Sequence, residues 1–594
     1  MKAFFQTVLA VIVGFFLVQI LLVLLLVAMV GGIVASMEEE PPAPVEESTV
    51  LCLDLQHPIV DRVVEKPLDM LRELDSSEPE PLGLYDVLEA ISKAKEDGRV
   101  VGIVLQASGG RVPLSIAGEL REELAAFRES GKFVYAYSDG YSAADYYLAS
   151  VADSVFIHPM GSFQWKGFTS TVPYLKDACA QFGIEPQVIR HGKYKSAVEP
   201  FLDSQMSEAN RQQITKFLGS MWGNLVDEVS ASRRISTEAL NRYADKLVFL
   251  LPEKALEKGL VDALMYEDQL DSVVCVAEGK AYDERPSVTK MTDYVAGMQL
   301  DKAIDFDAEK IAVVYAQGDI KDGKEVREEI GGAGFARVFD KLREDEAVKA
   351  VVLRINSPGG SALASEKMYR SLARLKAKKP VVVSMGAYAA SGGYYMAAPA
   401  DRIIASPFTI TGSIGVFGMY LTFGKLTKEK LHINMETVST NAHSDLGSLF
   451  RPLDAKEREV IQNSIEHTYD VFLRRVASGR DMTVGRVDEI AQGRVWTGED
   501  AKPLGLVDEL GGLRDAIAAA AEAAELENYR LSTYPRIKQE PYEKIMEMFL
   551  KTKTSLLEHY IPGVSEEEAF RQGVEMLVSK RGIRAELPVR YEVK

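Results

Sequence analysis

Short apolar runs recur along the chain from residue 49 onwards, and amphipathic segments separate them. VLCLDL (50–55), IAVVYAQ (311–317) and VKAVVLRI (348–355) are such runs, whereas SALASEKMYRSLARL (361–375) has the apolar spacing of a helix. Apolar runs of this length that alternate with helices are typical of buried, mainly parallel strands in α/β units. The pattern therefore predicts an α/β fold.

The first 37 residues follow a different pattern, because residues 3–37 contain no charged side chain. A helix needs about 20 apolar residues to cross a bilayer, whereas the apolar core of a cleaved signal peptide has only about 7–15. Residues 1–37 are therefore predicted to be a transmembrane signal anchor. Lys2 precedes the run, which favours a cytoplasmic N-terminus. The Glu- and Pro-rich residues 38–48 are predicted to be an extended tether.

The rest of the chain contains one long internal repeat. Residues 133–159 align without a gap on residues 381–407, 248 positions later, and KGLVDAL (258–264) resembles LGLVDEL (504–510). A repeat of this length is a domain and not a solenoid unit. The sequence predicts an N-terminal domain, a polar connection, a C-terminal domain and a C-terminal helical extension, at residues 49–277, 278–308, 309–534 and 535–594.

Composition narrows the possible functions. The 594 residues are 47% hydrophobic and 26% charged, which is the balance of a globular protein, and the formal net charge is −18. This charge disfavours a nucleic-acid partner. Three scattered cysteines, Cys52, Cys179 and Cys275, exclude a disulfide framework and a CxxC zinc site. We expect neither a metal nor a cofactor.

The two copies differ where a strand leads into a helix, and the difference indicates a site. Ser391, in Ala390-Ser391-Gly392-Gly393, falls on Ala143 of the first copy. The first turn of a helix has unpaired amides that can stabilise an oxyanion, and the turn at Gly359-Gly360 could supply another. The alternative is that Ser391 is an N-cap and that the glycines only form turns.

A serine nucleophile needs a base, and the sequence leaves two possibilities open. The seven histidines are scattered, and His443, downstream of the serine in its own domain, is the best placed of them. Lys195 of the first copy aligns with His443, so one copy offers a lysine and the other a serine. A lysine base must be partly desolvated so that its pKa falls. The alternative for Lys195 is an ordinary solvated cation.

The stretches YKSAVEPF (194–201), RINSPGGSA (354–362), AYAASGGYY (387–395) and TGSIGVFG (411–418) resemble the signal peptide peptidase A (protease IV) family, peptidase family S49, in its long duplicated form. The resemblance implies two tandem Clp/crotonase-like (ββα-superhelix) domains after one transmembrane helix. It implies a Ser/Lys dyad with Ser391 as nucleophile and Lys195 as general base. By the same resemblance, Gly359 or Gly360 would form the oxyanion hole with Gly392, Ser413 would bind the lysine amine, and the cleft would be lined by Ile414, Gly415, Val416 and Phe417.

The resemblance also implies a setting. The chain would be a single-pass protein of the bacterial cytoplasmic membrane with an extracytoplasmic body. It would assemble into a homotetramer and degrade cleaved signal peptides and other hydrophobic peptides. Two alternatives are a crotonase-like acyl-CoA enzyme, which uses the same paired amides on a thioester, and a non-catalytic membrane scaffold that binds peptides.

Overall fold

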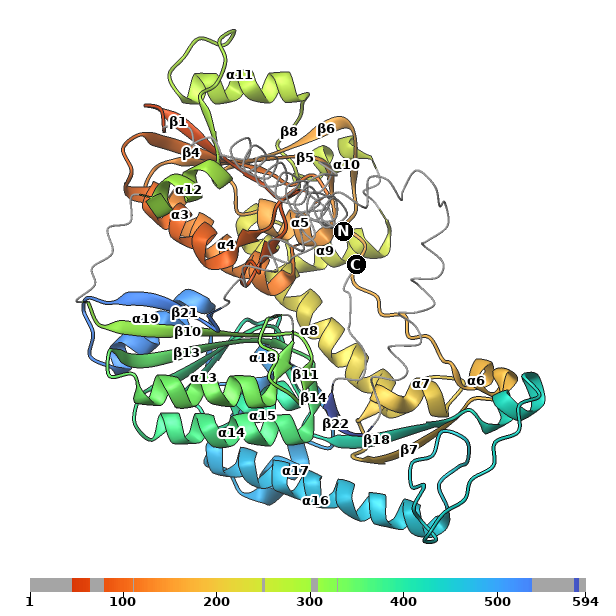
Figure 1. Ribbon diagram of the computed structural model, residues 1–594. Helices are drawn as coiled ribbons and strands as arrows, with labels where there is room; N and C mark the ends of the chain where they lie inside the picture. The colour runs from red at the N-terminus through yellow and green to blue at the C-terminus, as the bar shows by residue number, and fades with distance from the viewer. Residues whose placement is uncertain are drawn as a thin grey trace, which may run out of the picture.

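The computed structural model describes residues 45–64, 79–109, 112–247, 251–300, 308–327, 329–536 and 582–586. The predicted anchor over residues 1–37 lies outside these ranges. Among the helices in the described ranges, none combines the length and apolar character needed to cross a bilayer. The described chain forms two bodies, one above the other in Figure 1, that correspond to the two sequence repeats.

The first body is built on a six-stranded sheet in which every neighbouring pair is parallel. Its order is β8 (Ala263–Leu264), β6 (Ser154–Phe163), β5 (Phe133–Tyr141), β4 (Val100–Gln106), β1 (Thr49–Asp54) and β9 (Val288–Lys290). Helices α3 (Leu84–Glu96), α4 (Leu114–Arg128) and α5 (Ala143–Ala149) contribute buried side chains to its core. The α/β character predicted from the apolar runs is confirmed for this body.

The segment predicted to connect the two domains contributes to the first body. Strand β9 pairs in parallel with β1, and helix α12 (Met291–Leu300) follows it directly. Met291, Tyr294 and Val295 of this helix are buried in the core of the first body. A three-residue strand is too short to produce a recognisable alternation, so the polar composition of residues 278–308 hid both elements.

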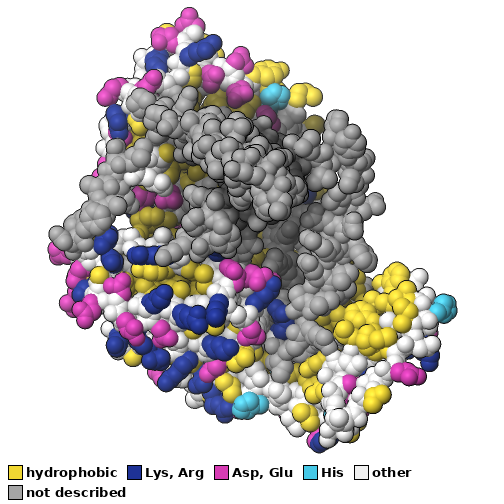
Figure 2. Space-filling model, viewed as in Figure 1, with side chains coloured by type: hydrophobic (Ala, Val, Ile, Leu, Met, Phe, Trp, Pro, Cys, Tyr) yellow, Lys and Arg dark blue, Asp and Glu magenta, His cyan; other side chains and the backbone are white. Residues whose placement is uncertain are grey.

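The second body repeats this plan with a larger sheet. The main path is β19 (Val495–Thr497), β17 (Ile410–Gly412), β15 (Val381–Ala390), β13 (Val348–Ser357), β10 (Lys310–Gln317) and β21 (Arg530–Tyr534). Strands β16 (Arg402–Ala405) and β20 (Glu509–Leu510) branch from β15, and only β17–β19 of the pairs in this sheet is antiparallel. Helices α13 (Gly332–Glu344) and α14 (Ala362–Lys376) pack on it, and Figure 2 shows many Lys and Arg side chains over them. Helix α19 (Leu513–Ala523) packs in a separate cluster.

A third sheet joins the two repeats. Strand β7 (Glu185–His191) of the first repeat pairs antiparallel with β18 (Val416–Thr422) of the second along its whole length, from His191 against Val416 to Glu185 against Thr422. On the other side of β18 lie β22 (Gly582–Glu586) and β14 (Gly359–Ser361), followed by β11 (Ile320–Lys321) and β12 (Ile330–Gly331). Within the predicted C-terminal helical extension, residues 582–586 therefore form a strand. Residues 537–581 of that extension lie outside the described residues.

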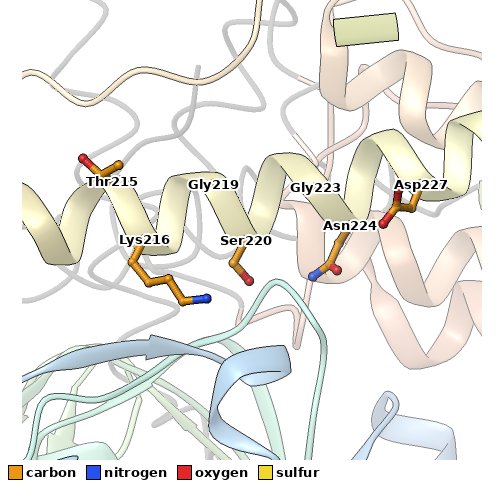
Figure 3. A pocket seen from close by; sticks show the side chains of 7 residues that line it. All are labelled: Thr215, Lys216, Gly219, Ser220, Gly223, Asn224 and Asp227. Carbon is orange, nitrogen blue, oxygen red and sulfur yellow. The ribbon is translucent and has the colours of Figure 1, made fainter. Parts of the chain in front are cut away.

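Helix α8 (Glu208–Arg233) runs from one body to the other (Figure 1). Figure 3 shows Lys216 and Ser220 on the side of α8 that faces the second body, where Lys216 pairs with Asp500 at 2.9 Å and the Ser220 hydroxyl bonds that of Thr497 at 2.8 Å. A shallow hollow of about 450 Å³ lies along α8, and Gly219 and Gly223 contribute to its wall. None of the predicted site residues lines this hollow.

Candidate active site

Ser391 lies between β15 and helix α15 (Gly392–Ala397), in a backbone conformation that is unusual for a serine. Its φ is 54° and its ψ is −112°, and its side chain makes no capping hydrogen bond to the helix. A non-glycine residue at positive φ is strained by about 1–3 kcal/mol. The Ser391 amide donates to the carbonyl of Gly412 at 2.8 Å, which ties the turn to β17. The Ser391 hydroxyl is therefore not used as an N-cap of α15.

In the corresponding turn of the first body, two side chains form hydrogen bonds with backbone amides at the start of α5. Ser142 is the N-cap of α5 and forms a capping box with Asp145: the Asp145 amide donates to Ser142 Oγ at 3.2 Å, and the Ser142 amide donates to Asp145 Oδ2 at 3.3 Å. Asp145 falls on Gly393 of the second copy. The first copy therefore satisfies its helix N-terminus internally, whereas the second copy makes no such bond.

The structure brings Lys195 to Ser391. Lys195 lies between β7 and the short helix η1 (Ser196–Val198), and its side chain is fully buried. Its Nζ lies within hydrogen-bond distance of three oxygens: Ser391 Oγ at 2.8 Å, Ser413 Oγ at 3.0 Å and the Ser413 carbonyl at 3.1 Å. Complete burial disfavours the charged form of an amine, as general-base chemistry requires. Two residues 196 positions apart thus meet inside the protein.

Parts of both repeats hold the lysine in place. The Tyr194 amide donates to the carbonyl of Gln492 at 2.8 Å. Gln213 of α8 donates from Nε2 to Ser196 Oγ at 2.8 Å, and its Oε1 accepts from the amide of Val495 at 3.3 Å. Nothing in the sequence pattern singles out Gln213, because a glutamine in an amphipathic helix is usually a surface residue. Its burial is visible only in the folded chain.

The Gly359-Gly360 turn has the backbone that the sequence suggests. The φ angles of Gly359 and Gly360 are 105° and 156°, values that residues other than glycine rarely adopt. A β-carbon at Gly360 would lie 2.0 Å from the carbonyl oxygen of Ile320, so glycine is required there. The Gly359 amide donates to Ser357 Oγ at 3.2 Å. The assignment of oxyanion donors among Gly359, Gly360 and Gly392 stays a prediction.

The four residues predicted to line the cleft are buried, and β18 begins at the third of them, Val416. Phe417 belongs to a cluster with Ala197 and Val198, which lie two and three residues after Lys195. The glycine among the four lies against the lysine: a β-carbon at Gly415 would be 3.2 Å from Lys195 Cδ. The segment therefore borders the Lys195 side chain.

His443, the alternative base, lies in a different environment. Its Nδ1 is 3.3 Å from both Asp454 Oδ2 and Glu457 Oε1, and its side chain is 46% exposed. Within the described ranges these three residues form a possible metal-ligand group, but Glu457 is already bound by Arg451. That hydrogen bond lowers the pKa of Glu457 to about 2. The structure therefore pairs His443 with carboxylates, and Lys195 with Ser391.

Comparison with known proteins agrees with the duplicated architecture. The model of peptidase family S49 matches residues 126–278 and again residues 373–527. The first match contains Lys195 and the second contains Ser391 and Ser413. Protease 4 of Haemophilus influenzae is 38% identical over 481 residues, which cover 78% of this chain and 76% of that protein.

Two further proteins extend the comparison. The chloroplastic serine protease SPPA of Arabidopsis thaliana is 34% identical over 487 residues, 81% of this chain and 70% of that protein. Among solved structures, the match to a ClpP1 mutant from Listeria monocytogenes covers 34% of this chain and 94% of that chain at 16% identity, with a TM-score of 0.24. The two family matches and the identity over most of the chain favour a peptidase over an acyl-CoA enzyme or a scaffold. The chain belongs to peptidase family S49 and is a serine protease.

Proposed function

We propose that Ser391 and Lys195 form the catalytic dyad of this protease, and that each repeat contributes one of the two groups. The observation that carries the proposal is the 2.8 Å contact between two buried side chains, Lys195 Nζ and Ser391 Oγ. Lys195 takes the proton of the Ser391 hydroxyl, and Oγ attacks the peptide carbonyl. Lys195 then returns the proton to the leaving amine, and water releases the acyl group.

The remaining residues support this chemistry. The tetrahedral oxyanion is held by the amide of Gly392 and that of Gly359 or Gly360. Ser413 orients the amine of Lys195 through its hydroxyl at 3.0 Å and its carbonyl at 3.1 Å. These groups need neither a metal nor a cofactor for acyl transfer.

The substrate is proposed to bind as an extended hydrophobic peptide. Strand β22 of the same chain lies between β14, which contains the glycine turn, and β18, and it pairs antiparallel with both. A substrate peptide in the place of β22 could pair through its backbone with the edges of both β14 and β18. The apolar residues Ile414, Val416 and Phe417 favour hydrophobic side chains. Cleaved signal peptides have this character, and their degradation is the proposed activity.

Membrane attachment and self-assembly complete the proposal. The uncharged run 3–37 would anchor the chain in a bacterial cytoplasmic membrane with the body outside the cytoplasm. Figure 2 shows hydrophobic side chains gathered in the region of α6 (Lys176–Phe182), which lies beside the β7–β18 sheet. In this patch Phe182, Leu431 and Ile433 are at least half exposed. We take this patch as a contact with another copy in a homotetramer. Sedimentation of detergent-solubilised full-length protein, with and without Phe182→Ser, tests the assembly.

The test of the dyad is hydrolysis of a hydrophobic peptide ester by the full chain. Ser391→Ala and Lys195→Ala should each reduce turnover by about 10³-fold or more, with unchanged thermal unfolding. His443→Ala should retain activity, and adding Ala143→Ser to Ser391→Ala should not restore it, because Ser142 and Asp145 close the first site. Full activity in Lys195→Ala would reject the dyad, and loss of activity only in His443→Ala would assign the base to the histidine.

A further inference from the structure

A buried ion cluster joins the two bodies close to the proposed active site. Arg354 of β13 is fully buried, and its Nη2 lies 2.7 Å from Asp61 Oδ1 and 2.7 Å from Glu119 Oε1. Asp61 follows β2 (Ile59–Val60), Glu119 lies on α4, and both belong to the first body. The third partner of the guanidinium is Ser384 Oγ, at 2.8 Å from Nη1. Two first-half carboxylates therefore reach into the second half.

The two carboxylates bind different elements beyond Arg354. Glu119 Oε2 accepts from the amide of Leu513, at the start of α19. Asp61 Oδ2 instead accepts from Asn356 Nδ2 at 2.8 Å. Because both oxygens of Asp61 act as acceptors, the amino end of the Asn356 amide must face it. The carbonyl end of that amide then points to β15, where it accepts from the amide of Tyr388 at 3.2 Å.

This Asn356–Tyr388 bond lies at an irregularity of the sheet. Ile355 of β13 pairs with Met385 of β15, but Ser357 pairs with Ala389, so β15 has two extra residues opposite Asn356. Beyond the irregularity β13 leads to the Gly359-Gly360 turn and β15 leads to Ser391. The side chain of Asn356 thus bridges the point at which both strands turn towards the proposed site.

The local sequence leaves room for the carboxylate from the other half. A β-carbon at Gly386 would lie 3.2 Å from Asp61 Oδ2. In the first body the residue aligned with Gly386 is Ser138. Its Oγ donates to the Ala107 carbonyl and accepts from the Gly140 amide, both at 3.0 Å. The first copy therefore bridges its strands locally, whereas the second copy depends on Asp61.

We propose that Asp61 is a positioning residue for catalysis, which orients Asn356 and thereby fixes the two strand ends that carry Ser391 and the glycine turn. The proposal rests on the proposed function, because it assumes that these strand ends form the active site. The first half then contributes to the reaction twice, through Lys195 and through the orientation of the partner strands.

The experiment compares Asp61→Asn with two other variants of the full chain. The side-chain amide introduced by Asp61→Asn has one acceptor atom and cannot satisfy both Arg354 and Asn356. Therefore kcat and the rate of Ser391 acylation by a fluorophosphonate probe should fall by about 10- to 100-fold, with little change in KM. Glu119→Gln removes a carboxylate from the same Arg354 without touching Asn356. It should lower the unfolding midpoint but change kcat little.

The exchanged pair Asp61→Asn/Asn356→Asp provides the rescue. The amide oxygen at position 61 can then accept from Arg354, while the amide nitrogen donates to the carboxylate at position 356. The second oxygen of that carboxylate accepts from the Tyr388 amide, so most of the lost kcat should return. This variant also tests the proposal if Asp61→Asn fails to fold, because the exchange restores a partner to Arg354, to the side chain at position 356 and to the Tyr388 amide.

Three outcomes would overturn the proposal: equal loss of kcat in Asp61→Asn and Glu119→Gln, no loss in Asp61→Asn, or no recovery in the exchanged pair. Ser391→Ala, measured beside them, separates this result from the proposed function. Full turnover in Ser391→Ala would reject Ser391 as nucleophile. Loss in Ser391→Ala together with any of the three outcomes would reject only the role of Asp61.

Discussion

Gly493 lies directly against Lys195, so that a β-carbon added at Gly493 would sit 2.6 Å from Lys195 Cβ. The φ of Gly493 is +77°, and its amide donates to the Ile414 carbonyl at 2.8 Å. The nearest atoms of Lys195 are its backbone N and Cα and its Cβ, so rotation of the lysine side chain cannot relieve a clash with an added methyl group. The backbone and Cβ of Lys195 therefore pack against a glycine of the other repeat.

Gly493→Ala should displace Lys195 from Ser391. The added methyl group and the positive φ together cost about 2–5 kcal/mol, and a shift of the amine by about 1 Å can lower the rate by about 100-fold. Peptide-ester hydrolysis and thermal unfolding measure the two effects. Gly485→Ala is the matched control, because a β-carbon there meets no atom within 4 Å. Equal activity in the two variants would contradict this packing.

Ser413→Ala should remove one of the two hydrogen bonds between Ser413 and the amine of Lys195 and should reduce activity without abolishing it. The substitution removes the hydroxyl partner at 3.0 Å but keeps the carbonyl partner at 3.1 Å. A hydrogen bond to a group that becomes charged contributes about 1.5–3 kcal/mol, so kcat should fall by about 10- to 100-fold. Ser406→Ala, at another buried serine of the same body, should leave kcat unchanged. An unaltered kcat and pH profile in Ser413→Ala would remove Ser413 from the mechanism.

Strand β22 should compete with substrate, because its residue Ala585 pairs with Gly360 of the glycine turn. Proline at position 585 has no amide hydrogen and disfavours a central strand, so Ala585→Pro should raise kcat/KM for a short hydrophobic peptide several-fold. Ala585→Ser keeps the amide and should behave like the natural protein. If Ala585→Pro is no faster than Ala585→Ser, the strand does not obstruct the site.

Glu457 should make the protein sensitive to acid. Its pKa is lowered from the ordinary 4.5 to about 2 by the hydrogen bond from Arg451, with further bonds from the Asp454 amide and His443. A carboxyl whose pKa is lower in the folded state stabilises it above pH 4.5, and this contribution disappears as the pH falls towards 2. Urea unfolding across this range should show a steep loss of stability.

Glu457→Gln should be less stable at neutral pH and should show a flatter acid dependence over the same interval. Glu459→Gln, at an exposed residue two positions along α16 (Ala455–Gly479), serves as the control and should retain the natural curve. Identical acid curves for Glu457→Gln and the natural protein would show that other groups dominate acid unfolding.

Much of the fold follows from patterns that are local in sequence. Buried strands such as VKAVVLRI are apolar throughout, and the offset between the repeats is enough to align Ser391 with Ala143. These signals reflect burial and strand–helix turns, which a few neighbouring residues determine. The same comparison identifies the turn that α5 closes with Ser142 and Asp145.

The contacts between the repeats could not be predicted in the same way. Asp61, Gln213 and Gly493 lie in unremarkable sequence, and their importance depends on elements that are distant along the chain. Strand β22 escaped prediction because its five residues acquire a strand conformation by pairing with β14 and β18. Non-local pairing of this kind leaves no periodicity in the segment itself.

The pairing of β7 with β18 has a consequence for the order of events during synthesis and folding. In the proposed dyad the first repeat supplies the amine and the second supplies the nucleophile. During synthesis, residues 185–191 can pair only after residues 416–422 have been made. Such distant partners slow folding. Under the proposed dyad, hydrolytic activity therefore arises only after the second repeat has been synthesised and its strand β18 has paired with β7.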